Sequence, residues 1–91
     1  MSIRPVFIGA SWCAPCKQTY PLFAKVVSDE GISADYVDVE EYDERAHGVT
    51  SVPTIRVFAA DDMYGPVLAE HRGGATEAQI RALFDRGVEL V

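Results

Sequence analysis

Two cysteines separated by two residues are the groups in this chain best suited to covalent chemistry. Cys13 and Cys16 are the only cysteines of the 91 residues, and they lie in the segment WCAPCK at residues 12–17. A thiolate attacks a disulfide, and a second thiol nearby can then break the mixed disulfide that forms. A pair with this spacing is therefore suited to repeated oxidation and reduction.

A zinc half-site is the alternative use of such a pair, because Cys-x-x-Cys spacing also occurs in zinc sites. Zinc takes four ligands, and only His47 and His71 remain to supply the others. Neither histidine has motif spacing to the cysteines. We expect His47 at a loop or helix end and His71 exposed on a strand, so the redox interpretation is favoured and no metal site is predicted.

The cysteines lie at an expected turn from a strand to a helix. The apolar run before them predicts a buried strand over Val6–Ala10, and apolar residues at helical spacing predict a helix from about Cys13 to Asp29. The unpaired N–H groups and the positive dipole end of that helix favour the thiolate of Cys13. Lys17 points partly away from Cys13 and adds little. Cys16 follows one turn later, close enough to form a disulfide.

The rest of the pattern predicts one α/β domain over residues 1–91 with the order β-α-β-(α)-β-β-α. The crossover helix, which contains Pro21 and ends at Gly31, makes the first two strands parallel. A turn makes the last two strands antiparallel. Thr76 and Gln79 match a capping box. The expected later elements are strands over Asp35–Val39, Thr54–Ala59 and Val67–Arg72, a short helical segment over Asp43–His47, and a last helix with a core-facing stripe of Ile80, Leu83, Phe84 and Val88.

Composition argues against several classes of protein. The net charge is −6 and Lys and Arg are scattered, which disfavours direct binding of nucleic acid. Apolar runs are too short to span a membrane, and the N-terminus lacks the pattern of a secretory signal. If Met1 is the native start, we expect a cytoplasmic monomer without a cofactor, in a compartment where structural disulfides are rare.

The densest acidic stretch covers residues 35–44. One interpretation is a solvated strand end and loop that aid solubility. The other is a surface that selects basic partners. Its acidic residues are Asp35, Asp38, Glu40, Glu41, Asp43 and Glu44.

Taken together, these features resemble the thioredoxin family over nearly the whole chain. A lone Cys-x-x-Cys is weak evidence, whereas several separated features in the same order are specific. The resemblance implies a minimal thioredoxin fold, with a mixed four-stranded sheet flanked by helices. The features are Trp12 before the first cysteine, Pro15 between the cysteines, Lys17 after them, Pro21, the segment Ser51–Thr54, and Gly74 and Ala75 before the last helix.

The resemblance also implies roles for individual residues. Cys13 would attack the disulfide of a substrate, and Cys16 would resolve the mixed disulfide. Pro53 would be a cis-proline that faces the cysteines, and the backbone of Val52 would pair with a substrate peptide as a β-strand does. Lys17 and Phe7 would tune the pair. The implied substrate-binding residues are Trp12, Ala14, Pro15, Val52, Pro53 and Gly74.

Three features depart from the usual thioredoxin. The chain begins at the strand before the cysteines, without the preceding β-α unit, and in this it is similar to glutaredoxins and short thioredoxin-like proteins. The family's buried aspartate, which helps to deprotonate the second cysteine, corresponds to Phe7, and the lysine that accompanies it corresponds to Tyr36. The dipeptide between the cysteines is Ala-Pro, where thioredoxins usually have Gly-Pro.

The implied function is a thiol-disulfide oxidoreductase that reduces protein disulfides through the Cys13–Cys16 pair. Its electrons would come from NADPH through a thioredoxin reductase-like flavoprotein. A glutaredoxin-like alternative would use glutathione, whose carboxylates need cations, and Arg4, Lys17 and Arg56 are the candidates near the expected groove. A second alternative is a thioredoxin-like binding module with dispensable cysteines.

Phe7 leads to the first testable prediction. Cys16 against an apolar wall lacks a base, and burial without a base disfavours a thiolate. The resolving step is then slow, or it uses water or the substrate as the base. We expect Phe7→Asp to speed the release of a mixed disulfide near neutral pH, measured by stopped flow, and to lower stability because it buries a carboxylate. Unchanged release would contradict this account of the missing base.

Overall fold

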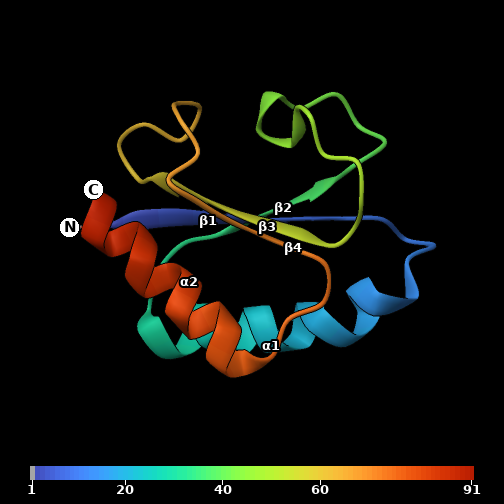
Figure 1. Ribbon diagram of the computed structural model, residues 1–91, viewed down its shortest axis with the longest axis horizontal. Coiled ribbons are helices and arrows are strands. Elements are labelled where there is room, and N and C mark those ends of the chain that lie inside the picture. The colour runs from blue at the N-terminus through green and yellow to red at the C-terminus, as the bar shows by residue number, and fades with distance from the viewer. Residues whose placement is uncertain (1) are drawn as a thin grey trace.

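A computed structural model describes residues 2–91, and Met1, the expected native start, lies outside them. The chain forms one mixed sheet with the strand order β2-β1-β3-β4, and both long helices cover the same face of that sheet (Figure 1). The elements are β1 (Ile3–Gly9), α1 (Ala14–Glu30), β2 (Asp35–Asp38), the 3-10 helix η1 (Glu44–Ala46), β3 (Thr54–Ala59), β4 (Ala69–Arg72) and α2 (Glu77–Leu90).

The predicted topology is confirmed. β1 runs parallel to β2, while β3 is antiparallel to both β1 and β4. β1 begins earlier than expected because Ile3 pairs with Ala59 at the far end of β3. The predicted strand over Val67–Arg72 is shorter, because the regular pairing with β3 extends only from Ala69 to Arg72.

Alternation along β1 divides the core into two parts. Side chains on successive strand residues point to opposite faces, so Phe7 contributes to the large cluster under α1 and α2, and Ile8 to a smaller one on the other face. The smaller cluster also contains Val37 and Phe58, and Ala46 of η1 packs against it. The two faces of β1 therefore hold the helices and the η1 segment in place.

The helix boundary signals are confirmed, with one error in α2. Thr76 and Gln79 form both hydrogen bonds of the capping box, and Gly31 ends α1 with a left-handed backbone. Val88 was expected in the core but is 41% exposed. Gly87 faces the core instead, because a Cβ atom there would lie 2.5 Å from Val57 Cγ1, so α2 approaches β3 too closely for a larger side chain.

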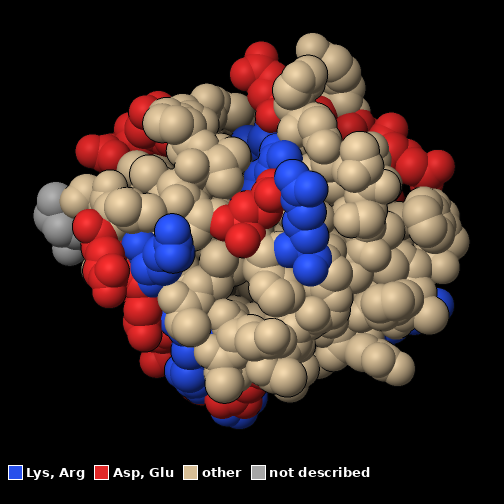
Figure 2. All heavy atoms as spheres, viewed as in Figure 1, with Lys and Arg blue, Asp and Glu red and all other residues tan. Residues whose placement is uncertain are grey.

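Ion pairs connect η1 to the edge of the sheet. Arg4 of β1 donates two hydrogen bonds to the Asp35 carboxylate, of 2.8 and 3.0 Å. Arg45 of η1, only 9% exposed, donates to both Asp35 and Asp43, at 2.6 and 2.9 Å. Part of the acidic stretch therefore serves the fold. On the face of the molecule seen in Figure 2, Lys and Arg side chains lie beside Asp and Glu rather than in one basic patch.

The Asp35 pairs predict how stability depends on pH. Hydrogen bonds from Arg4, and to a lesser extent from Arg45, hold the pKa of Asp35 below its ordinary value. A lowered folded-state pKa stabilises the fold above the unfolded-state pKa of about 3.9, and this contribution is lost as the pH falls through the folded value. We expect Asp35→Asn to lower the unfolding free energy by about 2 kcal/mol at pH 7, in line with hydrogen bonds to charged groups.

Urea denaturation at pH 7 and at pH 3 checks this prediction. Between pH 7 and pH 3, the unfolding free energy of Asp35→Asn should fall less than that of the parent chain. Glu30→Gln is the matched control, because Glu30 is exposed and makes no ion pair within residues 2–91. An equal loss on acidification in the parent and in Asp35→Asn would contradict the assignment.

Candidate active site

The two cysteines form a disulfide at the first turn of α1. Cys13 is the N-cap, with an extended backbone (φ −90°, ψ 108°), and its Cα lies 5.3 Å from that of Cys16. The Cys16 N–H donates to Cys13 Sγ at 3.2 Å. Pro15 lies in the first turn, where the missing N–H removes no intrahelical bond. The helix therefore begins at Ala14, one residue later than predicted, because the Cys13 side chain serves as its N-cap.

Burial does not distinguish the two sulfurs, but their surroundings do. Each cysteine is 4% exposed. Cys13 lies at the helix terminus, where the orphan N–H groups favour negative charge. Cys16 faces β1: a Cβ atom placed on Gly9 would lie 3.2 Å from Cys16 Sγ and 3.0 Å from Cε1 of the buried Phe7 ring. The side chain at position 7 is thus part of the wall next to the second cysteine.

Aromatic rings surround this wall. The Phe7 and Tyr36 rings, from paired positions of β1 and β2, are stacked with centroids 5.8 Å apart. Tyr20 of α1 packs edge-on against both, at 5.2 and 5.6 Å. Burial, and then the charge of Asp38, raise the pKa of Tyr36. Tyr20 and Tyr36 were not predicted as site residues, although the parallel pairing of the first two strands could have placed residue 36 beside residue 7.

Tyr20 and Tyr36 line an open pocket of about 290 Å³ beside Cys16. Its rim is accessible, because Tyr20 is 41% exposed and Tyr36 is 47% exposed. It gives the second cysteine a route to solvent that sequence reasoning did not anticipate. The lining residues are Ala10, Ser11, Cys16, Lys17, Tyr20, Pro21 and Tyr36.

The other residues of the predicted site in and just before the first turn of α1 lie at the surface. Ala14, Pro15 and Lys17 are exposed. Trp12 is 64% exposed, and its Nε1 donates to Glu40 at 3.1 Å. The indole next to Cys13 is therefore tied to the loop after β2.

The predicted residues outside α1 cluster near the start of β3. The Val52–Pro53 peptide bond is cis, and Val52 packs against the core cluster that contains both cysteines. The Pro53 carbonyl accepts from the Gly73 N–H at 2.7 Å. A Cβ atom on Gly74 would lie 3.4 Å from Thr19 Oγ1, so this turn lies close to α1 one turn beyond Cys16.

The histidines take no part in the cysteine site. His47 is exposed directly after η1, as predicted. His71 was expected to be exposed but is half-buried, because its Nε2 bonds the Gly74 carbonyl at 3.0 Å. Within residues 2–91, no three His, Cys, Asp or Glu side chains are grouped to hold a metal. In the same residues, no helix is long and apolar enough to cross a bilayer.

The candidate cations for glutathione are largely engaged elsewhere. Arg4 lies at the start of β1, which is the end of the strand far from the cysteines, and it binds Asp35. The prediction that Arg4 lies near the groove is therefore wrong. Arg56 is 8% exposed and donates to Glu70 at 2.7 Å and to the carbonyl of His47 at 2.7 Å. Of the three candidates, only Lys17 is near Cys16 and exposed.

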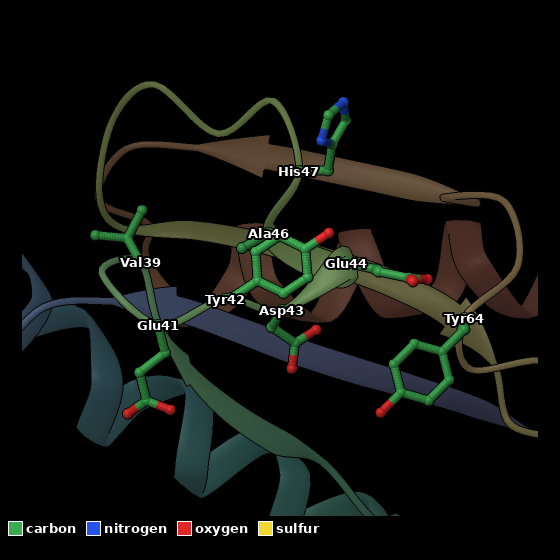
Figure 3. A pocket seen from close by; sticks show the side chains of 8 residues that line it. All are labelled: Val39, Glu41, Tyr42, Asp43, Glu44, Ala46, His47 and Tyr64. Carbon is green, nitrogen blue, oxygen red and sulfur yellow. The ribbon is translucent and has the colours of Figure 1, made fainter.

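A second pocket, of about 490 Å³, lies at the acidic loop after β2 (Figure 3). Tyr42 is 98% exposed and Tyr64 is 60% exposed. Glu41 and Glu44 make no ion pair in the described part of the chain, whereas Asp43 binds Arg45. Selection of basic partners by this surface stays a prediction. The lining residues are Val39, Glu41, Tyr42, Asp43, Glu44, Ala46, His47 and Tyr64.

Comparison with known proteins agrees with this site. Residues 2–65 match the family model described as a thioredoxin domain. The thioredoxin of Mycoplasma genitalium is 45% identical over 53 residues, covering 54% of this chain and 51% of that protein. The thioredoxin of Borreliella burgdorferi is 38% identical over 64 residues, covering 64% of this chain and 55% of that protein. The chain spans about half the length of these curated relatives.

Solved thioredoxin structures share the fold over a larger part of the chain. A mutant thioredoxin from Halobacterium salinarum superposes with a TM-score of 0.78 at 27% identity, covering 98% of this chain and 77% of that one. Fasciola hepatica thioredoxin superposes with a TM-score of 0.75 at 25% identity, covering 93% of this chain and 80% of that one. The predicted fold class and resemblance are confirmed. With a Cys-x-x-Cys disulfide at the start of α1 and a domain match over residues 2–65, this chain belongs to the thioredoxin family.

Proposed function

We propose that this chain is a thiol-disulfide oxidoreductase that reduces protein disulfides, with residues 1–91 acting as one domain. The observation that carries the proposal is the Cys13–Cys16 disulfide at the N-terminus of α1. A helix N-terminus stabilises a thiolate, which is the form that attacks disulfides. Thioredoxins need no prosthetic cofactor, and we expect a cytoplasmic monomer.

Cys13 is the proposed nucleophile. In the reduced chain its thiolate attacks one sulfur of the substrate disulfide, and the other substrate sulfur leaves as a thiolate. The Cys16 N–H, 3.2 Å from Cys13 Sγ, is placed to stabilise the thiolate. Cys16 then attacks Cys13 Sγ, which frees the second substrate thiol and forms the intramolecular disulfide.

The proposed substrate groove lies between the active-site turn and the start of β3. Trp12, Ala14 and Pro15 form an exposed surface around a buried Cys13. On the other side, the Val52 backbone would pair with an extended substrate segment, and Pro53 and Gly74 would line the groove. Gly74 lies close to α1, because a Cβ atom there would lie 3.4 Å from Thr19 Oγ1, and without a side chain it would leave room for an incoming chain.

The proposed electron donor is a thioredoxin reductase-like flavoprotein. Glutathione would need cations for its carboxylates, and Arg4 and Arg56 are engaged with Asp35 and Glu70. Lys17 alone is a weak anchor, because an exposed ion pair contributes only about 0–1 kcal/mol. The reductase is therefore favoured over glutathione.

Turnover of insulin disulfides tests the function. With NADPH and thioredoxin reductase we expect sustained reduction by the parent chain, and no more than the uncatalysed rate for Cys13→Ser, which removes the attacking sulfur. Cys16→Ser should stop after one attack and accumulate a mixed disulfide through Cys13, detectable by mass spectrometry. The parallel assay replaces the reductase with glutathione and glutathione reductase.

Two controls make the outcome decisive. Ser51→Ala keeps both cysteines and should turn over as the parent does, because the Ser51 backbone carbonyl, not its side chain, accepts from Thr54 Oγ1. Turnover with glutathione alone would overturn the proposed donor. Full biological activity of a Cys13→Ser, Cys16→Ser double variant would overturn the enzymatic proposal in favour of a binding module.

A further inference from the structure

The pocket beside Cys16 has a polar group on its far wall. Three atoms converge on the space above Gly9: a Cβ there would lie 3.2 Å from Cys16 Sγ, 3.2 Å from Tyr36 Oη and 3.0 Å from Phe7 Cε1. All three distances are shorter than ordinary contacts, so the glycine lets the sulfur, the phenol oxygen and the Phe7 ring come close together. Cys16 and Tyr36 both line the pocket. The pocket volume of about 290 Å³ exceeds the roughly 30 Å³ share of one water molecule.

The Tyr36 ring packs against two other rings, although 47% of the residue is exposed. Its ring is stacked on Phe7, with planes 17° apart, and packs edge-on against Tyr20 at 5.6 Å. Within residues 2–91, Tyr36 Oη makes no hydrogen bond. A phenol that packs against two rings and has no protein partner, on the rim of a solvent-accessible pocket, can donate its hydroxyl hydrogen to water.

The charges around this pocket keep the phenol protonated. Burial raises the pKa of Tyr36, and the charge of Asp38 and, more weakly, interactions with Tyr20 and Glu41 raise it further. Lys17 of α1 also lines the pocket. Tyr36 therefore does not accept the proton of a thiol itself. Its hydroxyl can instead donate to a water, whose lone pairs then remain available to accept a proton.

We propose that Tyr36 is a positioning residue for the resolving step, and that its hydroxyl orients a water that takes the proton of the Cys16 thiol. The proposal rests on the proposed function. The Cys16 S–H bond breaks and its proton passes to this water and on to solvent. The Cys16 thiolate attacks Cys13 Sγ, the bond between Cys13 and the substrate sulfur breaks, and that sulfur leaves as a thiolate while the Cys13–Cys16 bond forms.

Reaction of the reduced protein with dithiobis(nitrobenzoate) separates the two steps. Attack by Cys13 releases one coloured thiolate, and resolution by Cys16 releases the second. The nitrobenzoate thiolate leaves without a proton, so the second phase depends only on loss of the Cys16 proton. Stopped-flow absorbance from pH 5 to pH 10 follows both phases.

Tyr36→Phe keeps the stacked ring and removes the hydroxyl. We expect an unchanged first phase and a second phase about tenfold slower at neutral pH, less than a direct general base contributes, since unordered water remains available. The difference should disappear at high pH, because hydroxide then takes the Cys16 proton directly. Tyr20→Phe is the matched control, because it removes the other phenol of the pocket, which is not among the nearest atoms above Gly9.

The two phases test the role of Tyr36 and the proposed function separately. A second phase unchanged in Tyr36→Phe, a deficit that persists at high pH, or an equal deficit in Tyr20→Phe would overturn the role of Tyr36. Loss of the first phase in the parent chain would instead overturn Cys13 as the nucleophile, and with it the proposed function. Urea denaturation of both variants confirms that they are folded under the conditions of the assay.

Discussion

The hydrogen bond from the Cys16 N–H to Cys13 Sγ, 3.2 Å long, is the interaction on which the site depends. It makes the first sulfur both the cap of α1 and the group proposed to carry the charge when the pair is reduced. A thiolate is a better acceptor than a thiol, because hydrogen bonds to charged groups are stronger. We therefore expect reduction to replace the covalent bond between the sulfurs with a stronger cap at the same helix start.

The sheet keeps that helix start in place. β1 is the central strand that pairs with both β2 and β3, and its last residues lead into the turn before Cys13. Phe7 faces α1, while Ile8 packs on the opposite side. The ion pairs of Arg45 with Asp35 and Asp43 attach η1 to the sheet edge. Movement of the active-site turn would have to disturb both faces of this strand.

Local signals gave the sequence predictions that hold. The redox pair, the Thr76 cap and the strand over Thr54–Ala59 each follow from neighbouring residues. The errors concern distant packing. Val88 fits a helical stripe, but the close approach of α2 to β3 requires Gly87 there. Arg4 is a candidate cation for glutathione from the sequence alone, but the pairing of β1 with β2 places Asp35 beside it. The pocket beside Cys16 needs three separate elements, so no single stretch of sequence indicates it.

The hydrogen bond between Trp12 Nε1 and Glu40 has a consequence for observing this protein. Trp12 is the single tryptophan of the chain, it precedes Cys13, and it is 64% exposed. Because Trp12 adjoins Cys13, we expect its fluorescence to change when the disulfide is reduced, without an added label. The same fluorophore senses the Glu40 carboxylate on the loop after β2, and any polypeptide that covers the turn changes the water around it. The molecule therefore contains its own optical probe at the place where its chemistry occurs.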